Sequence, residues 1–194
     1  MTTAAYTLPP HVSLGPTLET ERLILRPPAV EDFPRWAEFM ADPETARFIG
    51  GVQPAPQVWR LICTVAGMWA LTGEGMFSIL EKETGKWIGR IGPLHPYGWP
   101  GREVGWSLHR DATGKGYAVE AAAATMDYAF DVLAWEDVIH CIAPENLPSA
   151  AVATRLGSRN RGPGVLPEPL QDIAIDLWGQ TRDEWAVNRT RLKG

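Results

Sequence analysis

The sequence predicts a single α+β domain in which helices pack on a layer of strands. Short runs whose apolar and polar residues alternate, the pattern of half-buried strands, recur along the chain. Longer runs between them place apolar residues at three- and four-residue spacing, the pattern of amphipathic helices. At 194 residues and 45% hydrophobic content, the chain is long enough to bury one substantial core.

The first half of the chain alternates between these two patterns. Residues 1–17 hold three prolines and no amphipathic period, which predicts a flexible leader before a folded domain at 18–194. The elements expected next are a strand at 22–26, helices at 30–40 and 54–71, and a hairpin of 77–82 with 86–91. Residues 95–101, rich in glycine, proline and aromatic residues, are expected to form a surface loop.

A glycine-rich bend, Gly114-Lys115-Gly116, connects a predicted strand at 103–108 to a predicted helix at 117–133. Glycine lets backbone N–H groups approach a ligand closely, and the first turn of a helix offers unpaired N–H donors with the positive end of its dipole. The expected guest is a phosphate, although a Gly-Lys-Gly run can also be a plain turn.

Two familiar phosphate-binding motifs do not fit this bend. A Walker loop needs a glycine at position 109 and Ser or Thr at 116, but His109 and Gly116 stand there. A dinucleotide fingerprint needs a third glycine where the chain has Val119. After the bend, a strand is expected at 138–142, a helix from Asn146 to Gly157, and a polar loop at 158–164.

Bulk properties exclude several classes of partner. The net charge of −5 and the pI near 5.4 disfavour nucleic acid, which needs a basic face. Neither a membrane span nor a signal peptide is evident, so we expect a cytoplasmic protein. Cys63 and Cys141 are expected to be buried thiols, and the scattered histidines give no case for a metal.

Several separated blocks resemble the GNAT acetyltransferase superfamily, and more narrowly its Rim-type branch of ribosomal-protein N-terminal acetyltransferases. They follow one another in the order of that branch between Leu18 and Trp185. The blocks are residues 18–26 with Asp32, residues 84–89, residues 103–106, residues 114–121, Asn146 to Ser149, and Leu156-Gly157.

The resemblance implies the GNAT fold, a mostly antiparallel, twisted and splayed sheet with helices on both faces. It also implies acetyl-coenzyme A (acetyl-CoA), whose pantetheine arm lies where the strands ending near His109 and Ile142 separate. Asn146 would hold that arm or a bridging water. The cofactor-binding residues it implies are Leu108, Arg110, Gly114, Lys115, Gly116, Tyr117, Ala118, Asn146 and Ser149, with the backbone supplying most of the contacts.

The implied reaction is direct transfer of an acetyl group from the thioester to a primary amine of a protein N-terminus or a small molecule. Glu103 is the candidate general base or water-positioning group, and an ordinary exposed strand residue is the alternative. Ser149 is the candidate proton donor to the leaving thiolate, with helix capping as its alternative.

The chain also departs from the family pattern. Asp111 stands where Gln or Arg is frequent, and a carboxylate there repels a pyrophosphate unless it points away or caps the helix. Thr113 replaces a frequent tryptophan, and the polar run at 158–164 replaces the start of a strand. These departures keep open a second function, an acyl-CoA-binding sensor with little transferase activity. A nucleotide-hydrolysing enzyme is the weakest alternative.

The nine tryptophans do not indicate an aromatic cage. Trp59 and residues 48–51 are expected near the acceptor. A homodimer is possible, with the alternating run at 173–178 as a candidate strand for self-association. Core positions are expected for Trp36, Trp69, Trp87, Trp106 and Trp135.

Overall fold

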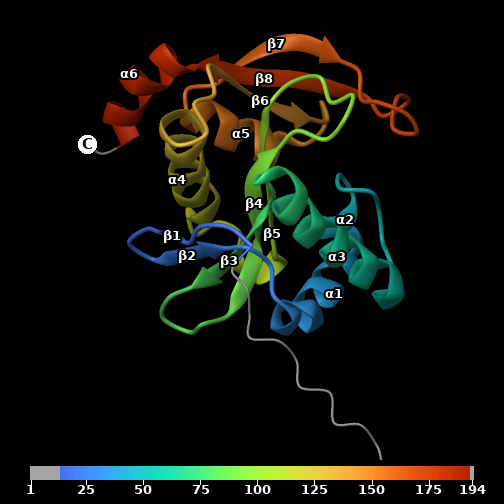
Figure 1. Cartoon of the computed structure of the whole chain (residues 1–194). Helices are drawn as coiled ribbons and strands as arrows, with labels where there is room; N and C mark the ends of the chain where they lie inside the picture. The colour runs from blue at the N-terminus through green and yellow to red at the C-terminus, as the bar shows by residue number, and fades with distance from the viewer. Residues whose placement is uncertain (1–13, 193–194) are drawn as a thin grey trace, which may run out of the picture.

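The computed structural model describes residues 14–192, which form a layered α+β domain around one sheet (Figure 1). The sheet has eight strands in the order β1-β2-β3-β4-β5-β6-β8-β7. All neighbouring strands are antiparallel except β5 and β6, which are parallel and are linked in the chain through α4. The parallel pair therefore lies in the interior of the sheet.

Most of the elements occur where the alternating and helical patterns predict them. The strands are β1 (Leu18–Glu19), β2 (Leu23–Arg26), β3 (Phe77–Glu81), β4 (Trp87–Leu94), β5 (Glu103–Leu108), β6 (Asp137–Ile142), β7 (Arg159–Gly164) and β8 (Ile175–Thr181). The helices are α1 (Phe33–Ala41), α2 (Pro43–Ala46), α3 (Ala55–Thr72), α4 (Tyr117–Asp131), α5 (Leu147–Arg155) and α6 (Arg182–Leu192), with 3-10 turns at Val30–Asp32 and Arg110–Ala112. The short helix α2 and the C-terminal α6 were not predicted.

Two hydrophobic clusters cover the two faces of the sheet. On one face, α1, α2 and α3 pack against Trp87 of β4, which stacks on Trp36. On the other face, the alanine-rich side of α4 packs on β4 and β5, with Ala121 and Ala129 fully buried. Because alanine side chains are short, α4 lies close to the strands that lead into its own N-terminus.

The tryptophan prediction is confirmed in this core. Four of the five tryptophans expected to pack inside are buried, namely Trp36, Trp69, Trp87 and Trp135. Trp106 is partly buried and packs against the α4 cluster. Trp59 keeps 43% of its surface exposed and meets Phe33 edge to face.

The prediction of a loop at 158–164 is wrong, because these residues include the strand β7. This strand lies at the edge of the sheet and pairs antiparallel with β8. Its residues are mostly exposed, so no apolar alternation marks it in the sequence. A register shift between Asn160 and Pro163 accommodates the proline, which an edge strand tolerates.

Two further expectations need correction. The run at 173–178 contributes to β8, which is paired on both sides by β6 and β7 and so offers no free edge. Cys63 is exposed on α3 rather than buried, because it lies opposite the face that carries Val58, Ile62 and Val65. Both cysteines are free.

The N-terminal part of the described chain already contacts the core. Leu14 packs against the α4 cluster, and a Cβ added at Gly15 would lie 2.5 Å from the ring of Trp69. Residues 1–13 of the expected leader lie outside the described residues. Between residues 14 and 192, no helix is long and apolar enough to cross a bilayer.

Candidate active site

The glycine-rich bend forms as predicted between β5 and α4. Gly114 and Gly116 have φ of 75° and 81°, a left-handed conformation that glycine adopts without strain. Gly116 is the residue before the first turn of α4. Among the described residues, none accepts a hydrogen bond from the N–H groups of residues 114–119. A run of free N–H donors at a helix N-terminus is a suitable site for a phosphate.

Asp111 does not face these donors. Its carboxylate binds Arg35 of α1 at 3.0 Å and Lys86 at 2.5 Å, and it lies 2.9 Å from Nδ1 of His109. Burial alone would raise the pKa of Asp111, but the hydrogen bonds from Lys86 and Arg35 outweigh it and hold the pKa at about 2. The carboxylate is therefore paired with these cations, which relieves the expected repulsion of a pyrophosphate.

A tether from the β1–β2 turn holds the other side of the bend. Arg22 donates to the carbonyl oxygen of Lys115 at 3.0 Å and forms an ion pair with Glu120 at 2.6 Å. Glu120 also accepts from the hydroxyl of Thr20 at 2.5 Å and from the backbone N–H of Arg22 at 2.9 Å. Glu120 thus connects the β1–β2 turn to the first turn of α4. The ammonium of Lys115 lies over the ring of Tyr117, whose hydroxyl donates to Glu81.

The parallel strands β5 and β6 separate beyond one register pair, Glu103 with Ile139. A regular ladder would next join the N–H of Cys141 to the carbonyl of Val104. Instead, the carboxylate of Glu103 accepts from that N–H at 3.0 Å. The carbonyl of Val104 lies 2.7 Å from Nδ1 of His140, so His140 carries its proton on Nδ1. Two side chains therefore satisfy both backbone groups where the strands part.

Glu103 is buried, not an ordinary exposed strand residue. It is 6% exposed, and its second oxygen accepts from Nε1 of Trp99 at 2.6 Å. The carboxylate lies above Gly105: its Oε1 is 3.3 Å from the position that a Cβ atom would take at Gly105. Burial raises the pKa of Glu103 above its ordinary value, and the hydrogen bonds from Cys141 and Trp99 oppose that rise only in part. Burial likewise raises the pKa of the neighbouring Cys141 thiol.

His140 belongs to a buried polar network behind the gap between the strands. Its Nε2 lies 2.9 Å from the hydroxyl of Ser158, which also accepts from the amide of Gln180. Burial lowers the pKa of His140 to about 4, so the ring is neutral at physiological pH. The network fixes the imidazole in the orientation that holds Val104.

At the start of α5, Asn146 is the capping residue. Its side-chain oxygen accepts from the backbone N–H of Ser149 at 3.2 Å. The capping role considered for Ser149 thus falls to Asn146. No residue in the described part of the chain forms a hydrogen bond with the Ser149 hydroxyl, which is partly exposed. Because α5 is the next element after β6, the Ser149 hydroxyl lies on the side of the β5–β6 gap that β6 forms.

Comparison with known proteins identifies this arrangement. The acetyltransferase (GNAT) domain family matches residues 22–159, more than half of the chain. The chain belongs to the GNAT acetyltransferases. A relative in Bacillus licheniformis, the uncharacterized N-acetyltransferase p20, is 33% identical over 150 residues, which cover 75% of this chain and 84% of that protein.

Solved structures show the GNAT fold across the whole domain. The acetyltransferase from Agrobacterium tumefaciens str. C58 is 35% identical, with a TM-score of 0.76, and the match covers 92% of this chain and 100% of the other. Mycobacterium smegmatis RimJ in complex with CoA-disulfide has a TM-score of 0.69 at 21% identity, over 89% of each chain. At that identity the likeness shows the fold alone, and this fold agrees with the resemblance to the Rim-type branch.

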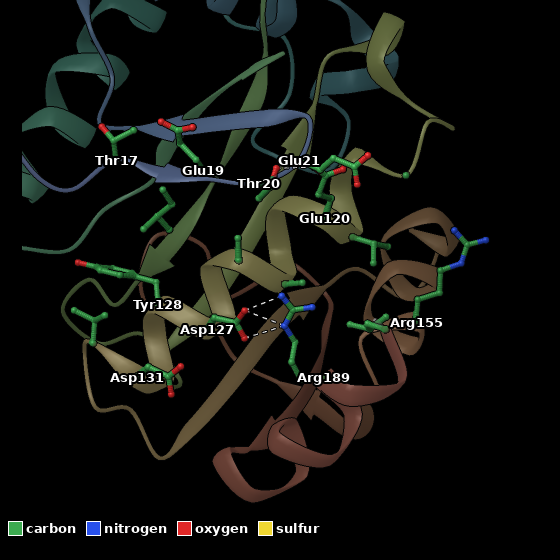
Figure 2. Close-up of a pocket in the computed structure, with 17 residues that line it drawn as sticks. Thr17, Glu19, Thr20, Glu21, Glu120, Asp127, Tyr128, Asp131, Arg155 and Arg189 are labelled. Carbon is green, nitrogen blue, oxygen red and sulfur yellow. Dashed lines mark hydrogen bonds and ion pairs between the residues drawn. The ribbon is translucent and has the colours of Figure 1, made fainter. Parts of the chain in front are cut away.

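The GNAT domain also carries an open groove along the outer side of α4, with a volume of about 1010 Å³ (Figure 2). It lies between the β1–β2 turn and α6, where Asp127 forms an ion pair with Arg189. Of the predicted cofactor residues, only Gly116 lines it. The groove therefore meets the bend at one end and is otherwise separate from the gap between β5 and β6.

In this GNAT acetyltransferase, the predicted site residues fall into three groups. Glu103 lies at the base of the gap, and Asn146 and Ser149 lie at the start of α5. The bend and its flanks hold Leu108, Arg110, Gly114, Lys115, Gly116, Tyr117 and Ala118. Sequence reasoning missed the supporting residues Arg22 and His140. It set Trp99 apart from the core tryptophans by its place in the loop, but did not predict its bond to Glu103.

Proposed function

We propose that this protein is an acetyl-CoA-dependent N-acetyltransferase that transfers an acetyl group directly to a primary amine. The observation that carries the proposal is the position of the Glu103 carboxylate at the point where β5 and β6 separate. Burial there raises the pKa of Glu103. A base with a raised pKa is better matched to an amine near neutral pH than an ordinary glutamate.

The residues at the bend suit the phosphates of acetyl-CoA. The N–H groups of residues 114–119 are free, and Asp111 is paired elsewhere. A side chain added at Gly114 would meet nothing within 4 Å, so the backbone there is open to a ligand. In the proposed complex, the backbone of Leu108, Arg110 and the bend holds the pyrophosphate, and Asn146 holds the pantetheine arm. Acetyl-CoA supplies an acetyl thioester.

Glu103 is proposed to accept the proton that the acceptor ammonium must lose before its nitrogen can attack. Trp99 and the N–H of Cys141 fix both carboxylate oxygens, so the base is positioned before the acceptor arrives. As the N–C bond forms and the C–S bond breaks, the departing sulfur needs a proton. Ser149, whose hydroxyl has no protein partner in the described chain, donates it and is reprotonated from solvent.

The test is an assay for free thiol with acetyl-CoA and a panel of primary amines, small molecules and peptides with free N-termini. Mass spectrometry of the amine then identifies the acetylated nitrogen. The proposal expects thiol release that depends on the amine. Binding of acetyl-CoA without thiol release on any amine would support the acyl-CoA-binding sensor instead.

A further inference from the structure

Trp99 lies in the loop before β5 and contacts the proposed base directly. Its Nε1 donates to a carboxylate oxygen of Glu103 at 2.6 Å. The loop is anchored around the indole, because the backbone N–H of Trp99 donates to the carbonyl of Pro96 at 3.0 Å. Gly98 packs against the β7–β8 loop, where a Cβ added at Gly98 would lie 3.1 Å from Pro167. The indole is therefore positioned beside the Glu103 carboxylate before any acceptor binds.

The ring of Trp99 has no partner for its face inside the described part of the chain. Between residues 14 and 192, neither an aromatic ring nor a cation lies over it. Other tryptophan rings contact a second ring or an arginine, namely Trp36, Trp59, Trp69, Trp87, Trp106, Trp135 and Trp185. An aromatic face carries negative potential and attracts cations.

Trp99 is also within reach of a ligand. It is partly exposed, whereas Glu103 is only 6% exposed. Because Trp99 is the more exposed member of the hydrogen-bonded pair, an acceptor that approaches the carboxylate meets the indole as well. The carboxylate and the aromatic face together form a site of negative potential, which suits a positively charged nitrogen.

We propose that Trp99 is an acceptor-binding residue whose ring holds the substrate amine as its ammonium ion beside Glu103. The inference rests on the proposed function and deepens it, because it states the form in which the acceptor binds. An ammonium that donates to the carboxylate oxygen held by Trp99 would lie at about 2.8 Å from that oxygen. Approaching on the side of the ring face, it comes within the roughly 6 Å over which a tryptophan ring attracts a cation.

The ammonium then gives one proton to the Glu103 carboxylate, as the proposed mechanism requires. The electron pair of the broken N–H bond stays on nitrogen, which becomes neutral. A neutral nitrogen is no longer attracted to the ring as a cation, so it is released from Trp99 to attack the thioester carbonyl. Trp99 thus selects the charged form for binding and does not hold back the reactive form.

The N–H and the ring of the indole have separable effects on binding. Phenylalanine at position 99 keeps an aromatic face and lacks the N–H donor, whereas leucine lacks both. We expect the KM for the amine to stay within about threefold of wild type in Trp99→Phe and to rise about three- to thirtyfold in Trp99→Leu. Tyr97→Leu is the matched control, since Tyr97 is a fully exposed aromatic residue of the same loop. An unchanged KM in Trp99→Leu would overturn the proposal.

The N–H of the indole acts on the pH profile. Its hydrogen bond to Glu103 opposes the rise in pKa that burial causes, as does the backbone N–H of Cys141. The Cys141 thiol is the other titratable group in contact with this carboxylate, and in the described chain no cation forms an ion pair with it. Both Trp99 variants should therefore raise the pKa of Glu103 and move the acid limb of kcat/KM to higher pH. A lower rate without movement of the limb would show that Trp99 only supports the loop.

A second test measures binding without turnover, by NMR of protein labelled with ¹⁵N at tryptophan. The indole signal of Trp99 is assigned by its loss in Trp99→Phe. Propylammonium chloride is titrated at neutral pH and constant ionic strength, with free coenzyme A present, which has no acetyl group to transfer. The neutral control is 1-propanol. We expect a saturable shift of the Trp99 signal with propylammonium alone, in the wild type and in Tyr97→Leu. No saturable shift, or an equal shift with 1-propanol, would overturn the ammonium site.

The two tests separate this site from the enzyme activity. Propylammonium binding at Trp99 with no acetyl transfer to any amine would contradict the proposed function and leave the ammonium site standing. Acetyl transfer with the same KM in Trp99→Leu and the wild type would contradict the role of Trp99 and leave the proposed function standing.

Discussion

The carboxylate of Glu103 accepts the backbone N–H of Cys141 on the neighbouring parallel strand, at 3.0 Å. In a continuous ladder, that N–H would bond to the carbonyl of Val104, which His140 holds instead. Since both separated groups are already satisfied, the gap between β5 and β6 is part of the fold and needs no ligand to open it. The same side chain that closes the edge of the gap is the proposed base.

Replacing Glu103 by Gln tests the proposed base. The amide oxygen can still accept the N–H of Cys141, whereas the amide nitrogen cannot accept from Trp99, and the group no longer takes a proton. We expect kcat to fall about a hundredfold or more. The wild-type rate should rise with pH through a pKa above 4.5, the ordinary value for glutamate, and the variant should lack this acid limb. Steady-state kinetics across pH measure both effects, with the exposed Glu136→Gln as control. An unchanged kcat would remove Glu103 from the reaction.

Ser149→Ala tests the proton donor. Since Asn146 caps α5, the helix should be unaffected, and we expect kcat to fall about ten- to a hundredfold. The dissociation constant for acetyl-CoA should stay close to that of the wild type. Thr154→Val changes an exposed hydroxyl on the same helix and serves as the matched control. A wild-type rate in Ser149→Ala would show that another group, or water, protonates the sulfur.

Glu120→Gln tests the tether of the bend. The change removes the charge of Glu120 and so weakens its ion pair with Arg22. Arg22 in turn donates a hydrogen bond to the carbonyl oxygen of Lys115. Since Glu120 supports the bend and does not face the reacting atoms, we expect acetyl-CoA affinity to fall several-fold with little change in kcat at saturation. Calorimetry and kinetics separate the two quantities. The neighbouring Glu21→Gln, with an exposed side chain, should behave as wild type, and equal effects of the two changes would refute the tether.

His140 gives a prediction for stability against pH. Its pKa is 6.5 ordinarily and about 4 in the fold. Between these values the unfolded chain binds a proton and the folded protein does not, so stability falls as the pH drops from 6.5 to 4. The loss from this group is roughly 3 kcal/mol. Between pH 6.5 and 4, the Tm of His140→Gln should change less than that of the wild type. The Tm of His95→Gln, a change on an exposed loop, should change as much as that of the wild type. Identical slopes in all three proteins would contradict the assignment.

The sequence predicted the fold and the bend because both depend on local patterns. Alternation up to Leu108 marks β5, and glycines at 114 and 116 mark the turn into α4. The edge strand β7 escaped prediction because its residues face water and include a Gly-Pro-Gly run, so hydrophobic periodicity carries no information there.

The support of the site could not be predicted, because it depends on contacts between distant elements. Asp111 looked unfavourable for a phosphate until the fold brought Arg35 and Lys86 to it. His140 looked like one of four scattered histidines, and its partner Ser158 lay in the supposed loop.

The most direct test of the account is a calorimetric titration with acetyl-CoA, free coenzyme A and ATP, in the wild type and in Gly116→Val. A valine at Gly116 would have to adopt a φ of 81°, which disturbs the backbone donors at the start of α4. The account predicts micromolar binding of both coenzyme A forms by the wild type, much weaker binding of ATP, and a large loss in the variant. Absence of acetyl-CoA binding by the wild type, or binding unaffected by Gly116→Val, would contradict it.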